Sequence, residues 1–334
     1  MARCVLALGP DSAGGMLVGL LGEARERLDV AVYELGPWYA AQLARAAGRG
    51  VAVRVLLDAH AGANSTSARL LQGTAVDCRL LGGHPGVEAH WKLLLRDGET
   101  VAVGSGNLLR RDAPQPGAAG TREWWAAVSG APSLATAARH AFAEAWAEAH
   151  PPPLAWRRAV VVVPAVPPVG VPHPAVPALH LDDLAAHAVH LGVGGAAACA
   201  VLGERVDAAG GRVLATVPYV HTRVAVVAAL LDRLDAARRR GADVGLLLGT
   251  PPEPADADVL RARSFATRVM DPARCTTGHA KGLVADGVAV VGSANWSGTG
   301  LGGNREAVLA VDDGRAADWF AAALDRDWQA SSPL

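Results

Sequence analysis

"HAKGLVADGVAVVGSANWS", residues 279–297, decides the fold, because the chain carries nearly the same pattern once before, as "HWKLLLRDGETVAVGSGNL" at residues 90–108. Each copy sets a histidine and a lysine two residues apart, continues through an Asp-Gly pair and ends on Gly-Ser-x-Asn. A long-range internal repeat of this kind predicts two copies of one structural unit. We therefore interpret the chain as a tandem duplication.

The segments around each copy also correspond, and they alternate between strand-like and helix-like patterns. We predict strands at 27–35, 51–59, 211–219 and 242–249, helices at 37–50, 65–73, 222–241 and 255–264, and closing helices at 138–149 and 316–328. Strands that are apolar almost throughout, separated by helices, are typical of sheets covered on both faces. The fold class that we expect is α/β, with each repeat a mixed, mostly parallel sheet flanked by helices.

A proline-rich stretch separates the two repeats, and prolines recur there too often for a helix or a central strand. We predict an N-terminal repeat at residues 1–150, a linker at 151–178 and a C-terminal repeat at 179–334. One copy of the motif pattern in each repeat makes chemical sense only if the copies meet. We therefore expect a two-lobed, pseudo-symmetric monomer.

Positions i and i+2 of a strand face the same side, so His90 and Lys92 project together, as do His279 and Lys281. An Asp-Gly pair is a strong hairpin signal, and it returns each strand beside the first. The returning strand brings Gly-Ser-x-Asn alongside the histidine and lysine. Each motif is thus predicted to gather its polar residues in one place.

The aspartates of the two turns, Asp97 and Asp286, are assigned to structure rather than to chemistry. The two returns differ in length, since six residues separate Asp97 from Gly104 and five separate Asp286 from Gly292. A slip of one residue would turn the returning strand over. We therefore expect different loop lengths, with a three-residue or bulged turn in the second hairpin.

The gathered residue types suit a phosphate site, in which lysine supplies charge, serine and asparagine donate hydrogen bonds, and a neutral histidine is a nucleophile. One histidine would attack phosphorus while the other protonates the leaving oxygen and then activates water. A glutamate on the next predicted strand of each half can orient a ring. The candidates are His90, His279, Lys92 and Lys281 for catalysis, Ser105, Asn107, Ser293 and Asn295 for phosphate binding, and Glu123 and Glu306 for histidine orientation.

These residues resemble the signature of the phospholipase D superfamily, H-x-K-x4-D followed by Gly-Ser/Gly-x-Asn, which stands here twice and complete. The resemblance implies a two-lobed fold with one active site at the lobe interface. It also implies hydrolysis or transfer of a phosphodiester without a metal or another cofactor, through a covalent phosphohistidine. In many members the N-terminal histidine is the nucleophile, which here would be His90, with His279 as the acid.

The substrate class stays open between three readings. A phospholipid substrate is favoured by the resemblance, an endonuclease or exonuclease acting on DNA or RNA is the close rival, and a non-catalytic phosphate-binding module is the third. The formal net charge of −1 and the pI near 6.8 give no global attraction to nucleic acid or acidic membranes. Peripheral membrane contact is compatible with either enzyme reading.

The N-terminal sequence leads us to expect neither a signal peptide nor a membrane span. The four cysteines are scattered without a C-x-x-C pair, which favours reduced thiols in the cytoplasm. Several further residues are secondary candidates. We expect Trp91 in the core and leave Trp296 between core and pocket. Four residues at corresponding strand ends would either border the site or serve hydrogen-bonded packing: Tyr33, Glu34, Tyr219 and His221. Arg110, Arg111 and Arg305 could touch a polyanionic substrate.

Overall fold

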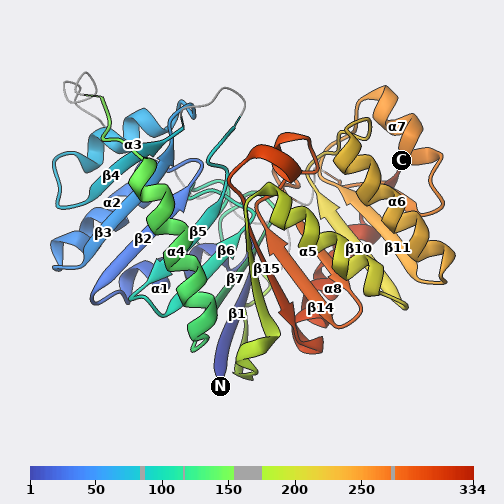
Figure 1. Ribbon diagram of the computed structural model, residues 1–334, viewed down its shortest axis with the longest axis horizontal. Coiled ribbons are helices and arrows are strands. Elements are labelled where there is room, and N and C mark those ends of the chain that lie inside the picture. Colours follow the sequence, from blue (N-terminus) through green and yellow to red (C-terminus); the bar gives the residue numbers. More distant parts are fainter. Residues whose placement is uncertain (83–86, 116, 154–174, 272–274) are drawn as a thin grey trace.

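The computed structural model describes residues 1–82, 87–115, 117–153, 175–271 and 275–334. Two eight-stranded sheets lie next to each other and form two lobes (Figure 1). The lobes meet where β6 and β7 of the first sheet contact β14 and β15 of the second. The predicted α/β fold with two tandem lobes is confirmed.

The first sheet has the strand order β4-β3-β2-β5-β6-β7-β1-β8. Its lobe contains β1 (Ala2–Gly9), α1 (Ala13–Gly22), β2 (Arg27–Val32), α2 (Pro37–Gly48), β3 (Ala52–Asp58), α3 (Asn64–Leu71), β4 (Asp77–Leu81), β5 (Lys92–Arg96), β6 (Thr100–Gly104), β7 (Glu123–Ser129), α4 (Pro132–Glu148) and β8 (Leu179–Leu184).

The second sheet repeats that arrangement, with the order β16-β12-β11-β10-β13-β14-β15-β9. Its lobe contains η2 (Ala186–Ala188), β9 (Val189–Val193), α5 (Gly195–Ala208), β10 (Arg212–Val217), α6 (Ala225–Arg239), β11 (Asp243–Leu248), α7 (Pro254–Arg261), β12 (Ala266–Val269), β13 (Gly282–Ala285), β14 (Val288–Gly292), η3 (Thr299–Gly303), β15 (Ala307–Asp312), α8 (Gly314–Gln329) and β16 (Ser332–Pro333). None of the helices in the described ranges has both the length and the apolar composition to span a bilayer.

The sheets are mixed as expected, but the expected parallel majority is wrong. Among the strands of the described residues, only the β2–β3 and β3–β4 pairs are parallel in the first sheet, and only β10–β11 and β11–β12 in the second. The motif hairpins β5–β6 and β13–β14 are antiparallel, and so are the pairs that β1 and β9 make with β7 and β15. The Asp-Gly turns reverse the chain directly, so no crossover helix is available there to make a parallel pair.

Three apolar cores hold the layers together. Helices α1, α2 and α3 cover the outer face of the first sheet, and α5 and α6 cover the corresponding face of the second. On the other face of each sheet, α4 and α8 bury their apolar sides in a core to which both lobes contribute, and there the rings of Trp124 and Phe320 stack at 4.2 Å. Trp91 lies in this shared core, as expected. Apolar surfaces of both lobes are thus buried against each other.

The two motif hairpins differ in length, but the prediction of which turn is longer was wrong. In the first hairpin Arg96 pairs with Thr100, which leaves a three-residue loop, whereas in the second Ala285 pairs directly with Val288. Both aspartates have positive φ, 52° at Asp97 and 48° at Asp286. The extra residue of the first hairpin lies in its loop, so corresponding side chains of the two returning strands point to the same face of their sheets.

Most of the predicted linker, residues 154–174, lies outside the described residues. Beyond it, β8 was assigned to the second repeat, but it pairs antiparallel with β1 and so extends the first sheet. The strand that corresponds to β1 in the second sheet is β9. We therefore propose that the second repeat unit begins after β8, at η2.

Candidate active site

The two motif copies face each other across the contact between the lobes. Main-chain hydrogen bonds join the residue before each motif glutamate to the residue two positions before the histidine of the opposite lobe: Arg122 N donates to Thr277 O at 2.9 Å, and Arg305 N donates to Glu88 O at 2.9 Å. These bonds have corresponding positions in the two repeats. The lobe interface therefore fixes the backbone on which both histidines sit.

Each histidine is held by a glutamate of the other lobe. Nδ1 of His90 lies 3.0 Å from Oε1 of Glu306, and Nδ1 of His279 lies 2.6 Å from Oε1 of Glu123. With Nδ1–H donating to the carboxylate, Nε2 is the ring nitrogen that remains to react. The sequence indicated both glutamates; the structure adds that the pairing crosses the interface, so neither ring is oriented unless the lobes are packed.

The two serines of the motifs support these glutamates. Ser105 Oγ donates to Glu123 and accepts from Trp124 N at 2.9 Å, and Ser293 Oγ donates to Glu306 and accepts from Ala307 N at 3.0 Å. Both serines are fully buried. This placement disagrees with the predicted phosphate contact, because each hydroxyl already holds a carboxylate and a backbone amide.

The two lysines lie beneath the histidines and are fully or almost fully buried. Nζ of Lys92 donates to His90 O at 2.5 Å, while Nζ of Lys281 donates to His279 O at 2.7 Å and lies 2.8 Å from both ring nitrogens of that residue. Burial lowers the pKa of Lys92 to about 8 and that of Lys281 to about 7, and nearby glutamates oppose the shift only in part. Because burial destabilises the ammonium form of both lysines, an anionic ligand beside them would stabilise their positive charge.

Burial also governs the histidine–glutamate pair of the first motif. It lowers the pKa of His90 to about 4, against the opposing effect of the Glu306 carboxylate, so the ring is neutral at pH 7. Burial alone would raise the pKa of Glu306, but His90 and Lys92 hold it below its usual value. The pair is thus a neutral imidazole beside an ionised carboxylate.

The two motif asparagines lie near the ends of strands β2 and β10, and both are largely buried. Oδ1 of Asn107 accepts from Glu34 N at 3.3 Å, which leaves the amide N–H groups to donate to a ligand. Asn295 hydrogen bonds with Tyr219. Asn107, unlike the two serines, thus keeps the donor capacity that the sequence analysis assigned to it.

The motif aspartates organise the turns at a distance from this chemistry. The Asp97 carboxylate accepts from the backbone N–H groups of Arg25, Glu26 and Arg27, and Asp286 accepts from those of Gly210, Gly211 and Arg212. Both thereby tie a hairpin turn to the start of a parallel strand. These bonds support the structural assignment of the two aspartates.

Side chains at the border of the site come mainly from the first lobe. The Tyr33 ring lies 5.0 Å from the His90 ring, and its hydroxyl donates to Glu88 Oε1 at 3.4 Å. Trp296, left open by the sequence, is buried in the core of the second lobe. Sequence reasoning missed Glu88, although it stands two residues before His90.

The basic candidates are partly engaged with carboxylates. Arg111 pairs with Glu34 at 3.4 Å and with Asp112 at 3.3 Å, and Arg110 lies over the Trp38 ring at 6.0 Å. Arg305 pairs with Glu148 at 2.5 Å, on the surface. His221 stands beside Tyr219, with 5.2 Å between their ring centroids.

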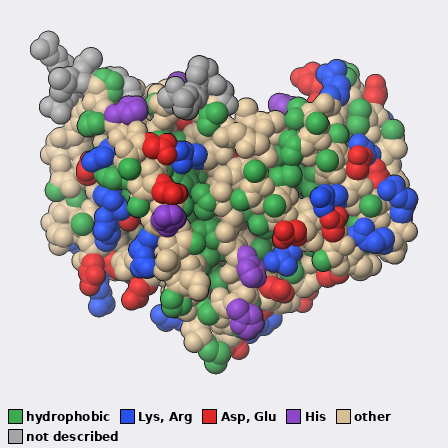
Figure 2. All heavy atoms as spheres, in the orientation of Figure 1, with side chains coloured by type: hydrophobic (Ala, Val, Ile, Leu, Met, Phe, Trp, Pro, Cys, Tyr) green, Lys and Arg blue, Asp and Glu red, His purple; other side chains and the backbone are tan. Residues whose placement is uncertain are grey.

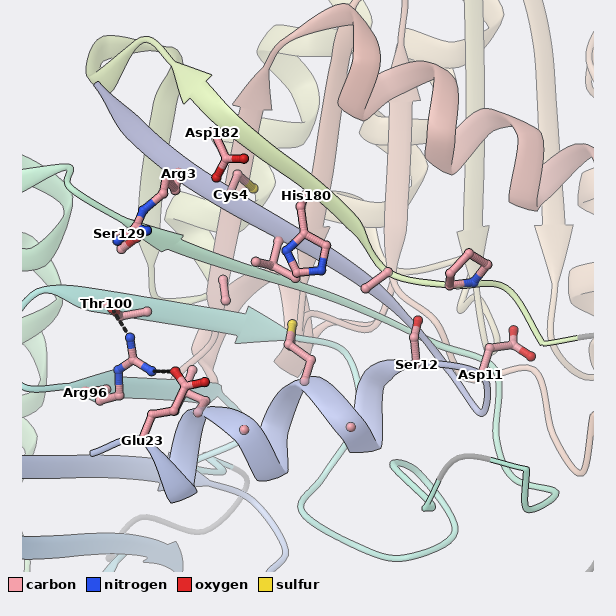
Figure 3. A pocket seen from close by; sticks show the side chains of 18 of the residues that line it. Arg3, Cys4, Asp11, Ser12, Glu23, Arg96, Thr100, Ser129, His180 and Asp182 are labelled. Atoms are coloured by element: carbon pink, nitrogen blue, oxygen red, sulfur yellow. Dashed lines mark hydrogen bonds and ion pairs between the residues drawn. The ribbon is translucent and has the colours of Figure 1, made fainter. Parts of the chain in front are cut away.

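A cavity of about 740 Å³ lies elsewhere, between α1, β1 and β8 (Figure 3). Its lining mixes apolar side chains with Arg3, Arg96, Glu23 and Asp182, and it contains no residue of either His-Lys pair. Within the described ranges, no three His, Cys, Asp or Glu side chains are grouped as metal ligands. The candidate site is thus identified by its paired chemistry, not by cavity size.

Comparisons with known proteins agree with the two-lobed fold. A family model described as the cardiolipin synthase, PLD-like domain matches residues 17–146 and 202–328, which include both motif copies. The crystal structure of phosphatidylserine synthase from Haemophilus influenzae is similar over 98% of this chain and 87% of that chain, with 13% identity and a TM-score of 0.68. Polyphosphate kinase from Porphyromonas gingivalis is similar over 96% of this chain and 50% of its own, with 13% identity and a TM-score of 0.62.

A third solved structure, Nuc from Salmonella typhimurium, a phospholipase D family member, matches 45% of this chain and 97% of its own, with 19% identity and a TM-score of 0.41. A comparison with curated protein sequences gives no match.

Proposed function

Because this chain belongs to the family of phospholipase D-like domains, we propose that it hydrolyses or transfers a phosphodiester through a covalent phosphohistidine. The observation that carries the proposal is the crossed pairing, in which each histidine is oriented through Nδ1 by a buried glutamate of the other lobe. Two oriented imidazoles at one interface supply a nucleophile and a proton donor together. No cofactor or metal has a step in this mechanism.

In the first step, Nε2 of neutral His90 attacks phosphorus, and the P–N bond forms as the P–O bond to the leaving alcohol breaks. Protonated His279 gives its Nε2 proton to the departing oxygen. Lys92, Lys281, Asn107 and Asn295 hold the non-bridging oxygens, because positive charge and N–H donors stabilise the charge that develops there. The low pKa of His90 supports its role as the nucleophile.

In the second step, neutral His279 accepts a proton from a water molecule or an alcohol, whose oxygen attacks phosphorus. The P–N bond breaks, and His90 returns to its neutral form. Water gives hydrolysis and an alcohol gives transfer. Glu123 stabilises the imidazolium form of His279 in both steps, as a carboxylate does beside a catalytic histidine.

Among substrates, we propose a phospholipid. Figure 2 shows Lys and Arg interspersed with Asp and Glu over the face that it displays, without a long basic track of the kind that binds a nucleic-acid backbone. The net charge of −1 supports the same choice. Peripheral contact with a membrane would deliver such a substrate.

We also propose that the protein acts as a monomer, since one chain supplies both halves of the site. All four cysteines are free thiols, which is consistent with the proposed cytoplasmic location. A nuclease acting by the same two-histidine mechanism, and a non-catalytic phosphate-binding module, are the outcomes that would replace the phospholipid reading.

The test is an assay in EDTA with fluorescent phosphatidylcholine and phosphatidylglycerol vesicles in parallel with labelled single- and double-stranded DNA. We expect turnover of a phospholipid that persists in EDTA and is lost in His90→Ala and His279→Ala. Turnover of DNA alone would identify a nuclease. Phospholipid turnover that both variants retain, or that EDTA removes, would contradict the proposed mechanism, and no turnover of any substrate would favour the binding module.

A further inference from the structure

Arg122 joins three parts of the molecule through a side chain that is almost fully buried. Its Nη1 donates to Asp11 Oδ2 at 2.8 Å and to Gly9 O at 3.0 Å, both in the first lobe. Its Nε lies 2.8 Å from Oδ2 of Asp327, on helix α8 of the second lobe, and Nη2 donates to Oδ1 of the same carboxylate at 3.2 Å. The planar guanidinium thus forms ion pairs with both carboxylates, and its N–H groups fix the direction from which each one is bound.

The backbone of the same residue is part of the lobe interface beside the catalytic centre. Arg122 N donates to Thr277 O at 2.9 Å, and Arg122 O accepts from His279 N at 3.0 Å. The next residue is Glu123, which binds Nδ1 of His279 at 2.6 Å. The position of the Glu123–His279 pair is therefore tied directly to where Arg122 is held.

Arg305 occupies the corresponding position before Glu306, and it provides a natural comparison. Its backbone N–H makes the equivalent interlobe bond, to Glu88 O. Its side chain, however, is 35% exposed and pairs with Glu148, which is 58% exposed. Exposed pairs of this kind contribute little to stability, whereas a buried pair fixes geometry and is costly to break.

We infer that Arg122 is a positioning residue for the reaction: through Asp11 and Asp327 it holds the lobes so that Glu123 orients His279 for proton transfer. This inference rests on the proposed function, in which His279 is the proton donor. It assigns no such role to Arg305. Substitution of Arg122 should therefore slow the reaction most for substrates whose leaving alcohol must be protonated as it departs.

The test compares Arg122→Lys with Arg305→Lys on two soluble phosphodiesters, one with a p-nitrophenyl and one with an alkyl leaving group. Lysine keeps the charge but loses the planar set of N–H groups, so the variant is expected to fold; circular dichroism and thermal unfolding check this. General acid catalysis contributes about 10²–10⁴-fold, so we expect Arg122→Lys to slow first-turnover alcohol release by about tenfold or more for the alkyl diester. We expect less than about threefold for the p-nitrophenyl diester, whose leaving group departs without a proton.

Arg305→Lys should leave both rates close to those of the wild type. Equal rates for Arg122→Lys and the wild type, equal losses on both diesters, or the same selective loss in Arg305→Lys would overturn the inference. If Arg122→Lys fails to fold, the triple variant Asp11→Asn, Arg122→Met, Asp327→Asn is measured in its place, because it leaves no buried charge unpaired. The same selective loss on the alkyl diester is expected of it.

Histidine-selective ¹⁵N NMR gives a second readout that does not require turnover. In the wild type we expect a protected Nδ1–H signal for His279, and in Arg122→Lys its loss or exchange broadening, with the His90 signal unchanged. An unaltered His279 signal would overturn the inference. A wild type without turnover on either diester would instead count against the proposed function, while the NMR result would still decide the role of Arg122.

Discussion

The two histidines have the same motif, the same crossed glutamate and the same supporting serine, yet they differ in burial. The His90 side chain is 8% exposed and the His279 side chain 27%. A histidine that water reaches can exchange protons with solvent between steps, whereas a more deeply buried ring stays neutral and nucleophilic. Under the proposed mechanism, the two copies of one motif would thus take different roles because their surroundings differ, although their sequences correspond.

The largest expected effect separates the two histidines by leaving group. His90→Ala should reduce turnover of alkyl and p-nitrophenyl diesters alike to background, because it removes the atom that attacks phosphorus. His279→Ala should slow the alkyl diester by about 10²–10⁴-fold but spare first-turnover release of p-nitrophenol. Rapid-mixing kinetics on both substrates measures this, and an identical pattern in the two variants would remove the distinction between them.

Next in size is the effect of the two glutamates. Glutamine keeps the shape of the side chain but stabilises imidazolium poorly, so we expect losses of about 100-fold or more. Glu306→Gln should act on both diesters, because it perturbs the nucleophile. Glu123→Gln should act chiefly on the alkyl diester. Rapid-mixing measurement of first-turnover alcohol release at pH 7 compares them, with Glu148→Gln, on the surface, as the matched control.

The two lysines should differ in the pH range over which they lose their positive charge. Since the pKa of Lys281 is lowered to about 7 and that of Lys92 to about 8, each ammonium is charged below its pKa and loses its charge as the pH rises through it. Sulfate keeps a constant charge over this range, so its dissociation constant should increase between about pH 7 and pH 9.

Isothermal titration of sulfate from pH 6 to pH 9 measures that change. Lys281→Met should bind more weakly at pH 6 and lose the part of the pH dependence that begins near pH 7. Sulfate binding that is independent of pH in the wild type would show that the lysines stay charged throughout.

The smallest effect concerns the turn aspartates. Asp97→Ala and Asp286→Ala each remove an acceptor for backbone N–H groups and place alanine at positive φ, so we expect a loss of about 1–2 kcal/mol of unfolding free energy. The asparagine variants keep an acceptor oxygen and should lose less. Urea unfolding measures this, and a near-complete loss of turnover in a folded asparagine variant would indicate a chemical role instead.

Much of the fold could be predicted from the sequence because the two repeats can be compared with each other, segment by segment. The strands and helices around each motif, and the residues that gather at the interface, followed from periodicity and from the Asp-Gly turns. The antiparallel majority did not follow, because strand direction depends on partners such as β1 and β7 that are far apart in sequence. The edge position of β8 was missed for the same reason.

Within the site, the sequence indicated which residues gather there, but it did not indicate which side chains pair with each other. Glu123 and Glu306 were found as partners for histidine, but that each serves the opposite lobe is a property of how the lobes pack. The engagement of Ser105 with Glu123 could not be read from spacing, because a hydroxyl has no preferred partner. One signal for Arg122 was present, since Arg-Glu occurs at both 122–123 and 305–306.

The central claim, a covalent intermediate on His90, is tested most directly by trapping it. Wild type and His279→Ala would be mixed with a p-nitrophenyl diester, quenched in alkali within the first turnover, and mapped by peptide mass spectrometry under conditions that preserve phosphohistidine. We predict one phosphoryl adduct on His90, longer-lived in His279→Ala because water is no longer activated. An adduct on His279, or p-nitrophenol released beyond one equivalent of enzyme with no adduct in either protein, would contradict the account.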